Sequence, residues 1–325
     1  MTYGFWKKLK RPFFALAPMA DVTDAAFREV MVRRGKPDVL WTEFVSVAGL
    51  MSKGKEKLLI DLRYTEGERP IVAQLFGSDP EQMYECAKLV RKMKFDGLDI
   101  NMGCPDRAIE KQGAGAALMK NPKRAGEIIR AAKEGAGRMP VSVKTRIGYT
   151  TNTLEEWIPI LVKEEPAAIT IHGRTRKEMS KVPARWEEIG KAALLIRKLA
   201  KPNTRPLVIG NGDVRDLADG REKAERFGVD GVMIGRGIFA NPWLFSGKYE
   251  GKEIPIKVRL RALVEHTRLF ESVFRGTKHF DIMKKHYKAY ASGFDGAKEL
   301  RIGFMGAKDA KEVEAIVKRA LLTQK

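Results

Sequence analysis

The chain has 325 residues, 44% hydrophobic and 31% charged, a composition that excludes a disordered protein and allows one large domain with or without a small one. No apolar run approaches the roughly 18 residues of a membrane span, and the N-terminus lacks an apolar leader, so we expect a cytoplasmic protein without a membrane partner. A formal net charge of +20 favours a polyanionic partner, with a generally basic composition as the alternative. Neither Cys86 nor Cys104 has a metal-ligand spacing, which indicates a reducing compartment and no metal site.

Apolar strands alternate with amphipathic helical patterns along the first three quarters of the chain. We expect strands at 15–20, 39–44, 71–77, 97–103, 141–148, 167–173, 206–212 and 231–237. Apolar residues at i, i+3 and i+4 predict helices over 24–34, 80–92, 121–134, 154–164, 186–200 and 215–227. Eight such units in about 240 residues predict an α/β fold of the TIM (β/α)8 barrel type, with a doubly wound parallel sheet as the alternative.

The pattern changes after residue 245, where strand signals stop. Residues 246–252 have the composition of a linker, and helical spacing follows over 258–274, 278–291 and 309–322. We therefore predict a barrel domain over 1–247 and a small all-α domain over 252–325. Residues 251–325 hold 17 basic and 9 acidic side chains, which favours a polyanion contact there. Lys284, Lys285 and Lys288, with His286 and Tyr287 between them, are candidate contacts or else a solvated helix face.

The segment from Asp99 to Pro105 places the thiol of Cys104 in the turn just past an apolar strand. In barrels, the loops at the carboxyl ends of the strands form the ligand-facing end, so this is a position for a catalytic group. Pro105 ends the strand and stiffens the turn. The alternative is a buried cysteine that serves as a small hydrophobic residue.

Polar and small residues occupy the carboxyl ends of seven of the expected strands, where a purely structural strand does not need them. The candidate site residues besides Cys104 are Pro18, Met19, Ala20, Gln74, Asn101, Lys144, Arg146, His172, Arg174, Asn211, Gly212, Asp213, Gly235 and Arg236. The glycines after the last two strands allow backbone N–H groups to approach an anion closely, and Arg236 adds a charged fork. This arrangement favours a phosphorylated cofactor.

Lys144 indicates which cofactor this is, because a cation beside the N1/C2 carbonyl end of a flavin stabilises the anionic reduced ring. Gln74 can hydrogen-bond the pyrimidine edge of the ring, and Pro18, Met19 and Ala20 can line the ring with little bulk. No GxGxxG fingerprint follows a strand, which disfavours a bound dinucleotide. We therefore expect FMN.

These residues resemble the tRNA-dihydrouridine synthase family in order and spacing over most of the chain. The matching motifs are Ala17 to Asp24, Gln74 to Gly77, Asn101 to Pro105, Gly113 to Met119, Val143 to Arg146, His172 to Thr175, Asn211 to Asp213 and Gly235 to Gly237. The resemblance implies an FMN barrel, a helical domain that helps to bind tRNA, and NADPH-driven reduction of uridine to 5,6-dihydrouridine by a chain that we expect to be a monomer. It implies FMN contacts from Pro18, Met19, Ala20, Gln74, Lys144, His172, Asn211, Gly212, Asp213, Gly235 and Arg236, a proton from Cys104, and substrate contacts from Asn101, Arg146 and Arg174.

The chemistry of this reaction suits the residues. A uracil C5=C6 bond conjugated to the C4 carbonyl accepts hydride at C6 and then a proton at C5. A thiol with a pKa of about 8.5 is mostly protonated at neutral pH and suits the donor role. The base has to leave the tRNA stack to reach the flavin, which predicts a basic surface and an extrusion step.

One segment departs from the family pattern. In residues 177–186, Arg185 stands where an acidic residue is common, and an aromatic residue and a glycine are missing, so we expect a different loop shape there. Two other functions are open. A small-molecule FMN barrel such as a dihydroorotate dehydrogenase would not need the basic helical tail. A non-catalytic tRNA-binding protein would not need both Cys104 and Lys144.

Overall fold

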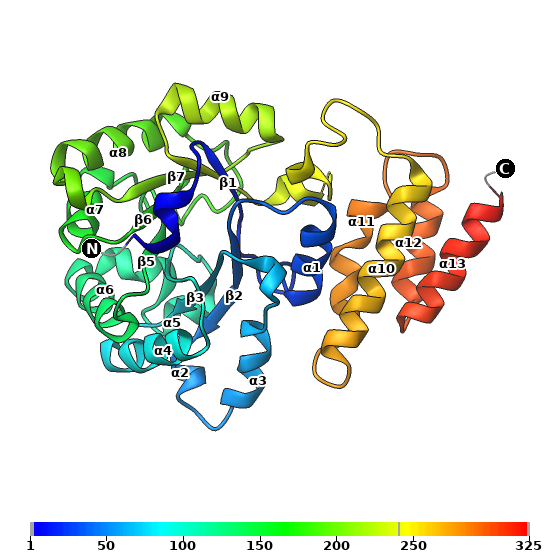
Figure 1. Ribbon diagram of the computed structural model, residues 1–325, viewed down its shortest axis with the longest axis horizontal. Coiled ribbons are helices and arrows are strands. Elements are labelled where there is room, and N and C mark those ends of the chain that lie inside the picture. Colours follow the sequence, from blue (N-terminus) through cyan, green and yellow to red (C-terminus); the bar gives the residue numbers. More distant parts are fainter. Residues whose placement is uncertain (1–2, 240, 324–325) are drawn as a thin grey trace.

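The computed structural model describes residues 3–239 and 241–323 of the chain. Within them, eight parallel strands form one sheet in the order β1-β8-β7-β6-β5-β4-β3-β2. A parallel bridge between Ala15 and Val39 joins β1 to the start of β2, so the two ends of the sheet meet (Figure 1). The strands are β1 Phe13–Leu16, β2 Leu40–Ser46, β3 Ile71–Phe76, β4 Gly97–Met102, β5 Val141–Arg146, β6 Ala168–His172, β7 Leu207–Asn211 and β8 Gly231–Ile234. The predicted TIM barrel is confirmed, and the doubly wound alternative is wrong.

Helices between the strands cover the outside of the barrel (Figure 1). They are α1 Ala25–Arg34, α2 Val47–Leu50, α3 Lys55–Leu59, α4 Pro80–Lys92, α5 Arg107–Lys111, α6 Pro122–Ala136, α7 Leu154–Lys163, α8 Trp186–Leu199 and α9 Leu217–Phe227. Asp24, Asp79, Asn121 and Asp216 each accept a backbone N–H of the helix that follows, which explains where α1, α4, α6 and α9 begin. The short helices α2, α3 and α5 were not expected, because four or five residues are too few to show a helical period.

The first strand ends earlier than its sequence suggests. We expected it over 15–20, but β1 ends at Leu16. Beyond it the backbone N–H groups of Val22 and Thr23 both bond to the carbonyl of Met19, and the Thr23 hydroxyl accepts the Met19 N–H at 2.9 Å. This local turn removes Pro18, Met19 and Ala20 from the sheet ladder and places them in the loop above it.

The barrel is packed on both faces of its sheet. All six residues of β3 are buried. Ile71 and Leu75 belong to the apolar layer between strands and helices, whereas Val72 packs inside the barrel with Trp41 and Trp6. Such two-sided burial explains why the strands read as continuous apolar runs without alternation.

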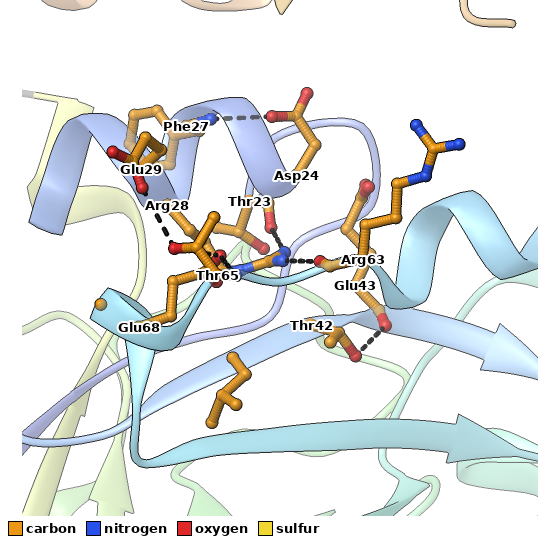
Figure 2. A network of polar contacts seen from close by, with 12 residues as sticks. Thr23, Asp24, Phe27, Arg28, Glu29, Thr42, Glu43, Arg63, Thr65 and Glu68 are labelled. Carbon is orange, nitrogen blue, oxygen red and sulfur yellow. Dashed lines mark hydrogen bonds and ion pairs between the residues drawn. The ribbon is translucent and has the colours of Figure 1, made fainter. Parts of the chain in front are cut away.

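Helix α1 is held to the barrel by a fully buried ion pair. Arg28 in α1 pairs with Glu68, and neither side chain is exposed. The other two guanidinium nitrogens of Arg28 donate to the carbonyls of Thr23 at 2.8 Å and Arg63 at 2.6 Å. Figure 2 shows these groups converging on Arg28. Each nitrogen of the buried charge therefore has a partner, which offsets its cost of desolvation.

The chain after residue 255 is helical. It contains α10 Ile256–Phe274, α11 Tyr287–Tyr290, α12 Ala297–Gly306 and α13 Ala310–Thr323, and a 3-10 helix over Phe280–Lys285. The helix expected over 278–291 is therefore replaced by a 3-10 turn and the short α11. Helix α12 was missed because it contains Gly303 and Gly306. These helices share an apolar core that also includes Ala25 and Ala26 of α1. None of the described helices is both long and apolar enough to cross a membrane.

Two lysines of this C-terminal region bind carboxylates of the barrel domain, in β2 and in the segments that follow β1 and β2. Lys278 Nζ lies 2.9 Å from Glu43, which is buried, and 2.7 Å from Asp61, which is partly exposed. Lys285 Nζ lies 2.9 Å from Asp21. We call this group of ion pairs, Asp21, Glu43, Asp61, Lys278 and Lys285, the seam. It fixes the helices against the ligand-facing end of the barrel.

Candidate active site

A cavity of about 650 Å³ opens at the carboxyl ends of β1, β5, β6, β7 and β8. The predicted site residues that line it are Pro18, Met19, Lys144, Arg146, His172, Arg174, Asn211, Gly212, Asp213, Gly235 and Arg236. Strand register explains the grouping, because parallel pairing sets Arg146 opposite His172, and His172 opposite Asn211. Side chains that are far apart in the sequence thus converge on one wall of the cavity.

The cavity carries an excess of positive charge. Among the described residues that line it, the cations are Lys144, Arg146, Arg174, Arg215 and Arg236, and Asp213 is the carboxylate. Asp213 pairs with Arg174 and, at 3.0 Å, with Arg236. Burial favours the neutral acid, but hydrogen bonds from Arg174 and the Ala184 N–H, with the charge of Arg236, hold the pKa of Asp213 below its usual value. One carboxylate cannot balance this set, so the cavity suits an anionic ligand.

Lys144 is held in the cavity by an amide. Its Nζ donates to Asn211 Oδ1 at 3.3 Å, and Asn211 Nδ2 donates to the Met233 carbonyl at 2.8 Å. Burial, followed by the nearby charge of Arg146, lowers the pKa of Lys144 to about 8. The ammonium is therefore predominantly charged at neutral pH.

His172 is a neutral imidazole with a defined tautomer. Burial and the charges of Arg146, Lys144, Arg174 and Arg236 keep its pKa well below its usual value. Nη1 of Arg174 lies 3.1 Å from His172 Nε2. A guanidinium only donates, so Nε2 accepts and the ring proton is on Nδ1.

Gly212 has a backbone conformation that a larger residue would not adopt easily. Its φ is +127°, and a Cβ there would lie 2.6 Å from the Cβ of Ala184. Trp186 Nε1 donates to the Gly212 carbonyl at 2.8 Å. At Gly235 a Cβ would make only ordinary contacts, with Ala17 and Met19. Thus Gly212 is required by the loop itself, while Gly235 keeps the wall beside Met19 low.

The Cys104 turn is fixed by two neighbouring side chains. Asn101 Oδ1 accepts the backbone N–H groups of Gly103 at 3.1 Å and Cys104 at 2.9 Å. Arg146 Nε donates to the Gly103 carbonyl at 2.7 Å. The thiol is only partly buried, and burial raises its pKa above the usual value, so it is protonated at neutral pH. The fully buried cysteine is Cys86, whose pKa burial raises to about 12.

Four predicted site residues do not line the cavity as the structure describes it: Ala20, Gln74, Asn101 and Cys104. Ala20 is exposed on the loop after β1. Gln74 has no exposed surface, and its amide bonds to Asp99 and Asn101. Asn101 pairs in register with Lys144, so the Cys104 turn adjoins the cavity at its β4 side. Asp99, which sequence reasoning left without a role, is the polar residue in the otherwise apolar start of β4 that could have signalled this network.

The two arginines predicted to contact substrate are engaged by the protein. Arg146 Nη1 donates to the carbonyls of Thr175 and Met179, both at 3.2 Å. Arg174, only 3% exposed, donates to the Val182 carbonyl and pairs with Asp213. In this structure both guanidinium groups hold the loop after β6, and a direct substrate contact stays a prediction.

The atypical segment 177–186 forms a defined loop. Arg185 Nη2 lies 2.7 Å from Glu178, and the Arg185 N–H bonds to the Gly173 carbonyl at 2.7 Å. The arginine found where an acid is common therefore pairs with an acid seven residues earlier, within the same loop.

The lysine run in the C-terminal region is only partly available for a ligand. His286 and Tyr287 are buried among the helices. Lys284 pairs with Asp281 at 2.7 Å, and Lys285 belongs to the seam. Lys288 is exposed.

Comparison with known proteins gives a consistent result. Residues 15–325 match the family model described as dihydrouridine synthase. A "Probable tRNA-dihydrouridine synthase 2" of Bacillus subtilis (strain 168) is 43% identical over 320 residues, which cover 98% of this chain and 96% of the relative. A "Probable tRNA-dihydrouridine synthase" of Staphylococcus aureus (strain MRSA252) is 42% identical over 320 residues, covering 98% of this chain and 95% of the relative.

Solved structures share the fold at low sequence identity. Morphinone reductase in complex with tetrahydroNAD aligns with a TM-score of 0.51 and 13% identity, over 76% of this chain and 89% of that chain. Histamine dehydrogenase from Rhizobium sp. 4-9 aligns with a TM-score of 0.56 and 13% identity, over 79% of this chain and 48% of that chain.

Proposed function

The chain belongs to the dihydrouridine synthase family, an oxidoreductase family, and on that premise we propose that it reduces uridine in tRNA to 5,6-dihydrouridine with bound FMN and with NADPH as the reductant. One observation supports this most strongly: a protonated, partly exposed thiol at Cys104 adjoins a cavity with a large excess of cations. Such a pairing suits a reaction in which an anionic cofactor and a proton donor act on one base.

The residues present fit FMN. Its phosphate suits the cationic wall, and its ring system suits the space beside Met19 and Lys144. We propose that Pro18, Met19, Lys144, His172, Asn211, Gly212, Gly235 and Arg236 hold it. Asp213 would not contact the phosphate, because a carboxylate repels it. Its ion pairs with Arg174 and Arg236 would instead orient these two side chains. Gln74 and Ala20 are assigned no direct contact, since Gln74 is buried within its own network and Ala20 faces solvent.

When bound, FMN supplies the hydride that is added to C6 of the uracil. Cys104 then donates the Sγ proton to C5, so the π electron pair of C5=C6 becomes the new C5–H bond and the sulfur is left as a thiolate that solvent reprotonates. Lys144 places positive charge beside the site, which stabilises the negative charge that develops there. The second N–H of the Asn101 amide, which is not used in the bond to Gln74, would orient the base.

The tRNA would contact the ligand-facing end of the barrel and the helices beside it. We propose the division into a barrel over 1–247 and a helical tRNA-binding domain over 252–325, with the chain acting as a monomer. Lys288 supplies one exposed positive charge on the helical side. Neutralisation of phosphates by such side chains accounts for most of the affinity of proteins for nucleic acids.

The experiment that tests this function has two parts. The purified protein should show flavin absorption, and the released cofactor should have the mass of FMN. With NADPH and unmodified tRNA it should then form dihydrouridine, measured by mass spectrometry of the digested tRNA. Flavin reduction without dihydrouridine, but with turnover of a free pyrimidine such as orotate, would instead support a small-molecule enzyme. Tight tRNA binding without any flavin would support the non-catalytic alternative.

A further inference from the structure

Asp99 is a buried carboxylate for which the proposed reaction has no use. It lies in β4 with no exposed surface. Oδ1 accepts a hydrogen bond from Ser142 Oγ at 2.6 Å, and Oδ2 accepts one from Gln74 Nε2 at 2.6 Å. A buried charge is costly unless its partners are fixed, so its retention at the centre of the barrel requires an explanation.

The hydrogen bonds run from Asp99 to the Cys104 turn without a break. Gln74 Nε2 donates to Asp99, and Gln74 Oε1 accepts from Asn101 Nδ2 at 3.0 Å. Asn101 Oδ1 then accepts the N–H groups of Gly103 and Cys104. Strand register places these groups in reach, since Gln74 pairs with Asp99 and Asn101 follows two residues later on the same face of β4.

The direction of this chain is determined at its two ends, by the carboxylate of Asp99 and by the backbone N–H groups of Gly103 and Cys104. An ionised carboxylate only accepts, so Gln74 has to present its NH₂ group to Asp99. Its oxygen is then turned to Asn101, which has to present its own NH₂ group in return. The oxygen of Asn101 is therefore the atom left facing the two backbone N–H groups. If Gln74 turned over, its oxygen would face the Asp99 carboxylate and its NH₂ group would face that of Asn101. If Asn101 turned over, its oxygen would face that of Gln74 and its NH₂ group would face the two backbone N–H groups.

We propose that Asp99 is a positioning residue for Cys104, acting through the fixed orientation of the Gln74 and Asn101 amides. We call the hydrogen bonds from Asp99 through Gln74 and Asn101 to the Cys104 turn the relay. The catalytic importance of Cys104 rests on the proposed function, but the relay itself is seen in the structure. What the relay needs at position 99 is a hydrogen-bond acceptor for Gln74. Asp99→Asn can still supply one, because Ser142 can accept from the new NH₂ group as readily as it donates. Asp99→Leu supplies none.

This difference separates the relay from two other roles of Asp99. If its charge were needed only to balance Lys144, both variants would lose the effect equally. If it only filled space, neither variant would change the Cys104 turn specifically. Ser142→Ala is the matched control, because it removes a hydrogen bond to Asp99 but leaves the path to Cys104 intact.

The test measures alkylation of each cysteine by iodoacetamide in the flavin-loaded protein, by mass spectrometry of the peptides. Cys104 reports the turn, and the fully buried Cys86 in α4 reports loosening of the helices packed on the barrel. We expect Asp99→Leu to raise the Cys104 rate at least about fivefold, in line with the coupling typical of shared networks, and Asp99→Asn and Ser142→Ala to stay within about twofold. Cys86 should remain unreacted in all of them.

An unchanged Cys104 rate in Asp99→Leu, or an equal rise in Asp99→Asn, would overturn the relay. If Asp99→Leu exposes Cys86 as well, a second pair decides. In Asn101→Asp, the new carboxylate only accepts, so Gln74 has to turn its NH₂ group toward position 101 and its oxygen toward Asp99; alkylation of Cys104 should become faster. In the double variant Asn101→Asp with Asp99→Asn, the NH₂ group at position 99 can donate to the Gln74 oxygen. The double variant should therefore restore the slow rate of alkylation. No restoration would overturn the proposal. Because no tRNA is used, failure of the relay and failure of the proposed reaction are observed separately.

Discussion

The strand-end cavity and the seam lie at the same end of the barrel, and both are rich in charged side chains. They differ in the balance of charge: cations are paired with carboxylates in the seam and outnumber carboxylates in the cavity. In the seam, Lys278 lies between Glu43 and Asp61, and Lys285 pairs with Asp21. In the cavity, five lining cations face one lining carboxylate, Asp213, and Arg215 has its own partner, Asp219, outside the lining. The buried pair of Arg28 and Glu68 below α1 follows the pattern of the seam (Figure 2).

This difference separates structural charge from functional charge. Where every charge has a partner inside the protein, the group contributes to folding or at least does not oppose it. Where cations outnumber the carboxylates around them, they repel one another and lower stability until an anion binds. Replacing a lysine by methionine should therefore lower the free energy of unfolding when the lysine lies in the seam and raise it when the lysine lies in the cavity.

The largest effect should come from Cys104→Ala, which changes the chemistry of the site but neither set of charges. We expect dihydrouridine formation to fall by about 10² to 10⁴, the usual contribution of a positioned acid, while NADPH still reduces the flavin and tRNA still binds. Single-turnover measurements separate these steps. Cys86→Ala is the control and should keep its turnover, and near-normal turnover of the Cys104 variant would remove this thiol from the acid role.

Lys278→Met tests the seam. It leaves the buried carboxylate of Glu43 without its cation, and we expect the free energy of unfolding to fall by about 3 kcal/mol. The matched control is Lys285→Met, in which both partners of the lost pair are about half exposed, and the change should stay within about 0.5 kcal/mol. Urea denaturation of the two variants measures both values. Equal losses would show that burial does not distinguish the two pairs.

Lys144→Met tests the cavity with the same substitution and should act in the opposite direction. The pKa of Lys144 is about 8 in the folded chain against an ordinary 10.5. Below pH 8 both states hold the proton and the folded state bears the full penalty, and between pH 8 and 10.5 the unfolded state holds more protons, so stability rises with pH.

Flavin-free Lys144→Met should therefore be more stable than the parent by about 1 to 2 kcal/mol at pH 7, allowing for partial solvent screening. The parent should become more stable as the pH rises above 8, and the variant should not show this increase. Its flavin content after purification should be lower, because the cavity has lost a cation beside the ring. A destabilised variant at pH 7 would contradict the contrast between the two regions.

The smallest effect should come from single surface lysines. Lys288→Ala should weaken tRNA binding a few-fold and reduce the slope of log affinity against log salt by about 1. Lys191→Ala is the control, since this lysine lies on α8, away from the C-terminal helices (Figure 1), and pairs with Glu188. Filter binding over a salt series measures both slopes. Equal slopes for the two variants would place the tRNA on another face.

The barrel could be predicted from sequence because each of its repeating units carries a local signal, an apolar run or a helical period. The end of β1 could not, since the bond between the Thr23 hydroxyl and the Met19 N–H decides where it stops. The 3-10 turn over Phe280–Lys285 could not either, because its apolar spacing is that of an ordinary helix. The cavity was predicted because most of its members follow strands. The support from Asp99 was not predicted, because Asp99 meets Gln74 only through strand register. The seam was not predicted either, because Lys278 meets Glu43 across 235 residues.

The hydrogen bonds of Arg146 to the loop after β6 determine which substitutions this loop can tolerate. Its guanidinium bonds to the carbonyls of Thr175 and Met179 and, on the other side, to that of Gly103. Backbone oxygens are the same in every residue type, so these contacts do not depend on which side chains the loop carries. The side chains of residues 177–186 can therefore change while the distance between the Cys104 turn and the loop after β6 is preserved. An unusual sequence at 177–186 is therefore compatible with an unaltered catalytic end of the barrel.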